Sequence, residues 1–332
     1  MTWNLIGHDW AIQLLRGHIL NDSLRHAYLI TGPHGIGKAN LAIRFVQTLT
    51  CPEKGFSGNP CLVCPTCKRV GRMEHPDLFP ISVEENSKQI KVDQIRELIH
   101  SLALSPYESD RRFGLLLDFE QANPSAQNSI LKTLEEPPGS VVLILTAVSA
   151  DALLETITSR CEEIKLNTVP IDVTTQGLER LHSVPSDEAR FLAHISGGKP
   201  ENALAMYADP EILERRKNLL DEHLLILGGN SVKRFAYANQ VSKDLRKVKE
   251  LLDTWTSIWQ DIMHQSGHSD MPLQNIDREE DIQLILQQVD LATARNSLVL
   301  FRRAYHLLNK NANLKLTLED LLLGLPTITP PS

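Results

Sequence analysis

The sequence contains few aromatic residues and no surplus of positive charge. Phe, Trp and Tyr make up 5% of its 332 residues, so it indicates neither an aromatic platform for single-stranded nucleic acid nor a carbohydrate-binding face. Lys and Arg number 34 against 41 Asp and Glu, which gives a formal net charge of −7. Because dedicated nucleic-acid binders are normally basic, this balance argues against a protein whose main role is tight DNA or RNA binding, while it leaves room for a small basic patch.

Long hydrophobic segments are also absent. The longest apolar stretch, residues 141–148, is far too short to cross a bilayer. Residues 1–10 lack the basic head, the apolar run and the small-residue cleavage site of a secretory signal. Four of the five cysteines lie between residues 51 and 67, which is a metal-binding pattern and not a disulfide framework. We therefore expect a cytoplasmic protein without membrane contacts.

The first half of the chain alternates between short apolar runs and helical patterns. Three runs are typical of buried strands, at residues 27–31, 113–117 and 141–146. Residues 38–50 have helical spacing, and Asn123-Pro-Ser125 opens another helix. Strands separated by helices need crossover connections and therefore form a parallel sheet. The pattern predicts an α/β domain over residues 1–166, with helices on both faces of the sheet.

Beyond residue 166 the periodicity becomes helical. Residues 186–195 have a helical pattern that stops at Gly197-Gly198, and nearly everything after residue 209 has helical spacing. The sequence therefore predicts a small helical domain over 167–208 and an all-α domain over 209–332. Trp255 and Trp259 lie one helical turn apart, so we expect them in the core of the last domain or at an interface.

The segment Gly32-Pro-His-Gly-Ile-Gly-Lys-Ala39 follows a predicted strand and opens a helix, which is the context of a P-loop. Gly32, Gly35 and Gly37 would let backbone amides surround a phosphate, and Lys38 would reach the outer phosphates. The next position normally carries a Ser or Thr hydroxyl for Mg²⁺, but here it is Ala39. We expect ATP or ADP to bind weakly at most; the alternative is an ordinary strand-to-helix turn.

An acidic motif at the end of the second predicted strand is incomplete. A P-loop enzyme that hydrolyses ATP needs an Asp for Mg²⁺ and a Glu beside it to orient the attacking water. If Asp118 is the metal carboxylate, Phe119 stands in place of the Glu; if the register shifts by one residue, Leu117 replaces the Asp. The pair is broken in either register, so we expect poor ATP hydrolysis.

The cysteine cluster follows the P-loop helix directly. Its spacing supplies four thiolates from a Gly-, Pro- and Asn-rich insertion, at Cys51, Cys61, Cys64 and Cys67. Four soft ligands suit tetrahedral Zn²⁺, and a site with four protein ligands and no water is structural. Free thiols, chance and redox catalysis are the alternatives. We expect a structural zinc ion.

Taken together, these motifs resemble the clamp-loader subunits of bacterial DNA polymerase III, in particular those of the delta-prime type. The resemblance is strong over residues 1–166 and looser afterwards. It rests on the P-loop, the cysteine insertion and several further stretches: Ile6-Gly-His8, His26-Ala-Tyr-Leu29, His75-Pro-Asp-Leu78, Ile90-Lys-Val-Asp-Gln-Ile-Arg96, Asn128-Ser-Ile-Leu-Lys-Thr-Leu-Glu-Glu-Pro-Pro138, Thr158-Ser-Arg-Cys161 and Asn311-Ala-Asn-Leu-Lys-Leu-Thr-Leu-Glu-Asp-Leu-Leu-Leu323.

The resemblance implies an AAA+ module over 1–166, a small helical lid over 167–208 and a helical collar over 209–332. In this family the collar joins subunits into a ring-like hetero-pentamer. Its implied partners are gamma/tau-like ATPase subunits and a delta-like subunit, and the complex acts on a sliding clamp and primed DNA. The chain itself would not be catalytic alone, although it would belong to a DNA polymerase III holoenzyme.

Two subunit types of this family fit the sequence: the ATP-hydrolysing gamma/tau motor and the delta-prime stator. The motor needs an intact P-loop, an adjacent Asp-Glu pair and a sensor-2 arginine in the lid. Ala39, Phe119 and Asn202 stand at these positions. These departures favour the stator, with the motor as the alternative. A standalone zinc-containing nucleotide switch is disfavoured, because the long helical tail suits oligomerisation.

Arg160 lies in Thr158-Ser-Arg-Cys161, which matches the SRC motif of the family. The resemblance implies that its guanidinium projects into the neighbouring subunit's ATP site as an arginine finger. The alternative is an exposed arginine that pairs with the last carbonyls of a helix over 151–157 or with Glu162. Thr146, at the end of the third strand, would occupy the sensor-1 position.

Overall fold

The computed structural model describes residues 3–53, 58–84, 87, 89–310 and 312–329. The chain divides into two units, Met1–Ala189 with Gly198–Asn202, and Arg190–Gly197 with Ala203–Ser332. The division falls within the predicted lid rather than at its ends, and the predicted boundaries at 166 and 208 stay a prediction. No helix in the described ranges is long and apolar enough to span a membrane.

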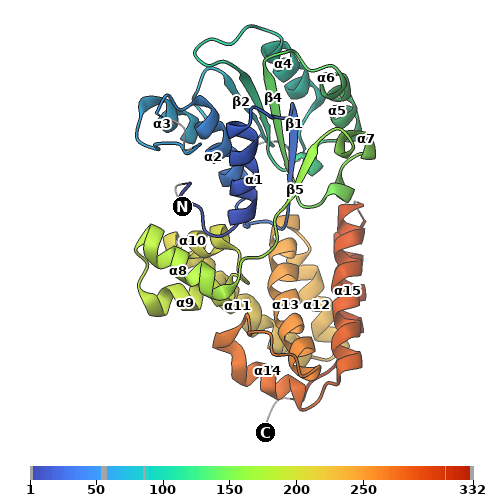
Figure 1. Ribbon diagram of the computed structural model, residues 1–332. Helices are drawn as coiled ribbons and strands as arrows, with labels where there is room; N and C mark the ends of the chain where they lie inside the picture. The colour runs from blue at the N-terminus through green and yellow to red at the C-terminus, as the bar shows by residue number, and fades with distance from the viewer. Residues whose placement is uncertain (1–2, 54–57, 85–86, 88, 311, 330–332) are drawn as a thin grey trace. The chain divides into compact units, whose positions relative to one another are not determined.

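A five-stranded parallel sheet forms the centre of the first unit (Figure 1). Its strands lie in the order β2 (Leu78–Ile81), β3 (Arg112–Leu116), β4 (Val141–Ala147), β1 (Ala27–Thr31) and β5 (Glu162–Lys165). In the central register Tyr28 lies opposite Ile144 on one side and Glu162 on the other. The three central strands are those that the sequence predicts, whereas the two edge strands are additional.

Helices cover both faces of this sheet, because successive residues of a strand point to opposite sides. Tyr28 and Ile30 belong to one hydrophobic core, while Ala27 and Leu29 belong to the other. The first face carries α1 (Asp9–Leu20) and α2 (Lys38–Thr50), with α3 (Pro65–Gly71) beside them; the second carries α4 (Val92–Leu102), α5 (Pro124–Ser129), α6 (Leu131–Glu135) and α7 (Glu155–Thr158) (Figure 1). The predicted α/β fold class is confirmed.

Two predicted helices of this unit differ in detail from the structure. The helix that opens at Asn123 is confirmed, and the Asn123 side chain caps it by accepting a hydrogen bond from the Ala126 amide. It is split into α5 and α6 at Ile130. The helix expected over 151–157 is instead a 3-10 turn, η3 (Ala150–Ala152), followed by the single turn of α7. A further helix, α8 (Ile171–His182), lies wholly within this unit.

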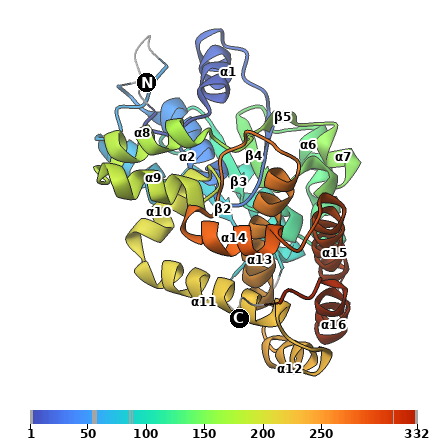
Figure 2. The ribbon, with the colours of Figure 1, turned by 90° about the horizontal axis from the view of Figure 1, so that it is seen from below.

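The rest of the chain is helical, as predicted. Two helices contain the division between the units: α9 (Ser186–Ile195) and α10 (Pro200–Ala208). The second unit then continues with α11 (Pro210–Leu227), α12 (Ser231–Val241), α13 (Leu245–Ser266), the 3-10 turn η4 (Ile276–Arg278), α14 (Glu279–Leu286), α15 (Leu291–Asn309) and α16 (Leu314–Gly324) (Figure 2).

The core of the second unit is built around two tryptophans. Trp255 and Trp259 are both fully buried, so the core placement expected for them is confirmed. Trp259 donates from Nε1 to Nε2 of His223 at 3.0 Å, and Trp255 donates to the Leu219 carbonyl. Burial lowers the pKa of His223 to about 3, so its imidazole is neutral and accepts the indole hydrogen bond.

Arg234 of α12 is a buried cation that binds the C-terminal end of α16. Its guanidinium donates to the carbonyl oxygens of Leu322 and Leu325, each at 2.7 Å, and to that of Ile226 at 3.2 Å. These contacts attach α12 to the end of α16, which lies beside it in Figure 2. The last carbonyls of α16, which have no partners within the helix, thereby gain charged donors.

In the first unit the loop before β3 is organised by Asp77, which is fully buried. Its carboxylate accepts hydrogen bonds from the amides of Tyr107, Glu108 and Ser109 at 2.7–2.9 Å and from the Ser109 hydroxyl at 3.0 Å. Burial by itself raises the pKa of Asp77, but these hydrogen bonds outweigh it and hold the pKa below its ordinary value.

Replacement of Asp77 by Ala leaves these donors unpaired, and we expect it to destabilise the chain by about 3–5 kcal/mol. Asp93→Ala, at an exposed carboxylate of α4, serves as the control. Since the folded-state pKa of Asp77 is depressed, its contribution is present above the unfolded pKa and is lost as the pH falls through the folded one. Urea unfolding of both variants at neutral and acidic pH measures this, and equal midpoints for the two variants at neutral pH would contradict it.

Candidate functional site

The glycine loop lies at the carboxyl end of β1 and leads directly into α2. Gly35 and Gly37 have φ of 74° and 109°, a left-handed backbone that glycine adopts without strain. Lys38 is the first residue of the helix and is 5% exposed. Its ammonium donates to the carbonyl oxygens of Gly32 at 2.8 Å and Pro33 at 3.1 Å. The lysine is therefore bound by its own loop.

The segment that follows Gly198 packs on this loop within the same unit. The Glu201 amide donates to the Gly35 carbonyl at 3.0 Å, and the Glu201 carboxylate accepts from Asn40 Nδ2 at 2.7 Å. A Cβ added to Gly35 would lie 1.9 Å from Oδ1 of Asn202. Asn202, which the resemblance aligns with the sensor-2 arginine, thus brings a neutral amide against the loop.

Two carboxylates from the turn after β3 face the loop. Asp118 has a left-handed backbone with φ of 46°, and its amide donates to the Thr146 hydroxyl at 2.8 Å. The 3-10 turn η2 (Phe119–Gln121) follows, with Phe119 fully buried in the core. Ligand atoms of His34, Asp118 and Glu120 all lie within 4.8 Å of one another.

This convergence adds a residue to the sequence interpretation of the acidic motif, and the broken pair stays a prediction. Phe119 does interrupt the adjacent pair, but the turn returns the next acidic residue, Glu120, to the side of Asp118. The sequence does carry a signal for this arrangement. Asp118 and Glu120 flank one apolar residue, and a turn at that residue can bring the two carboxylates together. Sequence reasoning missed Glu120 and His34 because their convergence depends on the turn and on the packing of the loop.

Charges near Lys38 act in opposite directions. Burial lowers the pKa of Lys38, while the carboxylates of Asp118, Glu120 and Glu201 raise it, and the net direction is downward. Burial also raises the pKa of Glu120 and of Glu201. Three carboxylates therefore act on one ammonium, and the raised pKa values of Glu120 and Glu201 favour their neutral forms over those of ordinary glutamates.

The four predicted cysteine ligands converge at the start of α3. The Sγ atoms of Cys51, Cys61, Cys64 and Cys67 lie within 4.8 Å of one another, and Cys51 and Cys67 are buried. Cys61 Sγ and Cys67 Sγ are 4.0 Å apart. Tetrahedral zinc with zinc–sulfur bonds of about 2.3 Å implies sulfur separations of about 3.8 Å, so the thiol set fits a zinc ion.

Backbone amides around the cluster point at the sulfur atoms. The Cys61 amide donates to Cys51 Sγ, the Cys64 amide to Cys61 Sγ and the Cys67 amide to Cys64 Sγ, at 3.3–3.4 Å. The amides of Cys64 and Val63 lower the pKa of Cys61 to about 6. Such donors stabilise thiolates, which are the form that binds a metal.

Arg160 follows α7 and has a side chain that is 34% exposed. Its guanidinium donates to the Thr156 carbonyl at 2.8 Å and to the Glu135 carboxylate at 2.7 Å. Helix carbonyls and Glu162 are the partners expected from the sequence for an exposed Arg160, and a helix carbonyl, that of Thr156, is indeed a partner. The carboxylate is Glu135 of α6 and not Glu162, which instead pairs with Arg25.

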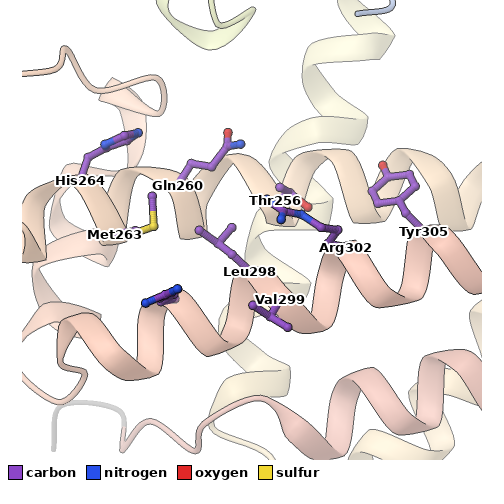
Figure 3. A pocket seen from close by; sticks show the side chains of 9 residues that line it. Thr256, Gln260, Met263, His264, Leu298, Val299, Arg302 and Tyr305 are labelled. Atoms are coloured by element: carbon purple, nitrogen blue, oxygen red, sulfur yellow. The ribbon is translucent and has the colours of Figure 1, made fainter. Parts of the chain in front are cut away.

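The second unit carries a groove of about 590 Å³ between α13 and α15 (Figure 3). Apolar side chains and two arginines line it, including Met263, Leu298, Val299, Arg295 and Arg302. Val299 is 53% exposed. The groove thus combines apolar contact area with positive charge.

Comparisons with known proteins bear on these features. Residues 7–170 match the family model described as DNA polymerase III, delta subunit. The chain is 34% identical over 209 residues to DNA polymerase III subunit delta' of Pseudomonas aeruginosa, and 31% identical over 211 residues to that of Bacillus subtilis. The resemblance to clamp-loader subunits of DNA polymerase III is confirmed.

The matches differ in how much of each protein they cover. The match spans 62% of the length of each of these two delta' relatives. The gamma subunit of Buchnera aphidicola is 25% identical over 97% of this chain and 89% of its own. Among solved structures, a gamma subunit-related protein of Thermotoga maritima covers 94% of this chain at 20% identity, with a TM-score of 0.45.

The buried side chain of Phe119 anchors the turn that carries Asp118 and Glu120 in the core, and replacing it tests this anchor. The substitution Phe119→Glu creates an adjacent Asp-Glu pair. We expect it to destabilise the chain by at least about 4 kcal/mol, because it buries a carboxylate in an apolar cluster. Phe119→Leu, the matched control, should cost about 1–2 kcal/mol. Urea denaturation followed by circular dichroism compares them, and similar midpoints would argue against this view of the turn.

Proposed function

We propose that this chain is a delta-prime-like stator of a DNA polymerase III clamp loader. In this role it takes part in ATP-driven loading of a sliding clamp onto primed DNA without hydrolysing ATP itself. The observation that carries the proposal is the conformation of the glycine loop, residues 32–39. Its lysine is bound by the loop carbonyls, and an uncharged Asn202 side chain packs against Gly35.

Several features support a degenerate ATP site. Phosphate oxygens would have to replace the two carbonyl contacts of Lys38, and Ala39 offers no hydroxyl to place Mg²⁺ beside them. Phe119 stands at the position of the catalytic Glu and is committed to the core, so its side chain cannot orient water. Gly32, Gly35, Gly37 and Lys38 would therefore hold ATP or ADP weakly, without turnover.

We propose that Arg160 serves the ATP site of a neighbouring subunit. It is partly exposed and ends on the surface, and its bonds to Glu135 and Thr156 fix the guanidinium in one direction. A planar, permanently charged donor in a fixed orientation suits the charge that develops on a transferred phosphoryl group. The chain would thus assist catalysis in trans.

The partners in this proposal are gamma/tau-like ATPase subunits and a delta-like subunit in a hetero-pentamer. Sliding clamp and primed DNA are reached through the complex. The groove between α13 and α15 supports an oligomerising role for the helical unit, because its exposed Val299 and its two arginines suit a partner helix with apolar and acidic side chains.

The second candidate is a gamma/tau-like motor subunit of the same machine. It is favoured by the nearly full-length match to the Buchnera aphidicola gamma subunit. It requires that the chain turn over ATP, and this separates the two candidates by direct measurement.

We also propose that Cys51, Cys61, Cys64 and Cys67 hold a structural zinc ion. The sulfur separations and the amide donors described above support it. With four thiolates the ion would have no open position, so it would stabilise the insertion and take no part in a reaction.

ATP turnover by the purified chain is the first test. The stator predicts that the wild type hydrolyses ATP no faster than Lys38→Ala, because neither has a complete catalytic set. Steady-state phosphate release measures the rates. A wild-type rate well above that of the variant would identify a motor subunit instead.

Arg160 is tested inside a clamp loader reconstituted with its ATPase subunits. We expect Arg160→Ala to slow hydrolysis at the neighbouring site on the order of 10³-fold, the usual value of an arginine finger, and Arg160→Lys to rescue little. Single-turnover hydrolysis resolves this one site among several. Arg96→Ala, at an exposed arginine of α4, is the control. An assembled complex with unchanged hydrolysis would remove Arg160 from catalysis.

Metal analysis tests the zinc proposal. After dialysis, purified wild type should retain about one tightly bound zinc per chain, and Cys64→Ser should lose it, because three thiolates bind zinc less tightly than four. Cys161→Ser keeps the metal, since Cys161 lies outside the cluster. Wild-type protein with well under one zinc after purification without chelators would disprove the site.

A further inference from the structure

A second set of metal-ligating side chains lies apart from the cysteines. His34 comes from the glycine loop, while Asp118 and Glu120 come from the turn after β3. One ligand atom of each lies within 4.8 Å of the other two. We call these three residues the His34 cluster. It joins two segments that are far apart in the sequence, so the fold and not local spacing brings the ligands together.

The turn that carries the two carboxylates is held in place on both sides. The Asp118 amide is bonded to the buried Thr146 hydroxyl, and Phe119 is anchored in the hydrophobic core with no exposed surface. Asp118 and Glu120 therefore cannot separate without breaking this anchor. Preorganised ligands of this kind lose little conformational freedom when they bind an ion.

One carboxylate oxygen of the cluster has no hydrogen-bond donor among the described residues. Oε2 of Glu120 is buried and accepts no hydrogen bond from any residue that the structure describes. The Lys38 ammonium, whose charge acts on Glu120, is itself bonded to the carbonyls of Gly32 and Pro33. A buried carboxylate oxygen without a donor is costly, and a bound cation removes that cost.

The charge around the cluster also favours a cation. The carboxylates of Asp118, Glu120 and Glu201 all interact with the single ammonium of Lys38. With all groups ionised, this leaves two negative charges in excess. A divalent ion beside Asp118 and Glu120 would balance them.

We propose that His34, Asp118 and Glu120 bind one divalent transition-metal ion, Mn²⁺ or Zn²⁺, in the absence of nucleotide. An imidazole nitrogen with two carboxylates suits these ions better than Mg²⁺, which prefers oxygen ligands, or Cu⁺, which prefers sulfur. The ion connects the glycine loop to the end of β3. This site does not rest on the stator role.

The test uses Mn²⁺ as the probe on the 332-residue chain loaded with one zinc ion per chain, enough for the cysteine cluster, after excess zinc has been removed. Mn²⁺ prefers oxygen and nitrogen ligands, so it leaves the four thiolates occupied by zinc. Electron paramagnetic resonance of free Mn²⁺ during a titration without nucleotide gives the number of bound ions and their affinity. We expect one Mn²⁺ per chain, and an increase of the melting temperature as Mn²⁺ is added.

Two variants assign the ligands. His34→Asn and Glu120→Gln should each weaken Mn²⁺ binding at least tenfold, since each removes one of three protein ligands. His268→Asn and Glu84→Gln, at exposed positions outside the cluster, are the matched controls and should bind as the wild type does. Melting temperatures without Mn²⁺ check that all four variants fold.

The proposal is overturned if the wild type binds no Mn²⁺ up to about 1 mM, or if either His34→Asn or Glu120→Gln binds it as tightly as the wild type. Neither result bears on the proposed stator, which is judged by ATP turnover and by Arg160. A positive result would equally leave that question open, because the titration contains no nucleotide.

Discussion

The two hydrogen bonds from the Lys38 ammonium to the carbonyls of Gly32 and Pro33 determine how the whole site is arranged. A buried ammonium must have partners, and this one takes them from the backbone of its own loop. With the lysine turned inward, the loop packs closely against the start of α10, where Asn202 meets Gly35. The acidic turn after β3 then faces the loop with a carboxylate oxygen still unpaired.

Sequence patterns predicted the centre of the fold and the thiol cluster for clear physical reasons. Strands β1, β3 and β4 are covered on both faces, so they are almost continuously apolar and stand out from their surroundings. The cysteines lie close in sequence, and close spacing alone limits how far apart their sulfur atoms can be. The edge strands carry a weaker signal, because β2 contains a proline and β5 has a single apolar residue, Ile164, among its four positions.

What the sequence did not predict depends on contacts between distant segments. Glu135 is the partner of Arg160, but it belongs to a helix that a linear pattern does not relate to the arginine. His34 meets Asp118 and Glu120 only because the sheet places the ends of β1 and β3 at one edge and the intervening Phe119 turns into the core. In the linear motif Phe119 only marks the absence of a glutamate. The motif does not show that Glu120 lies close to Asp118 in the folded chain.

The burial of Phe119 also has an evolutionary consequence. A glutamate at this position would have to enter an apolar cluster that includes Leu116, Ala122 and Leu145, so the cluster would need to be rebuilt before the change could be tolerated. Selection for folding alone is then enough to retain the phenylalanine, whether or not anything selects against hydrolysis. An adjacent acidic pair at this position therefore requires changes elsewhere in the cluster as well as at Phe119.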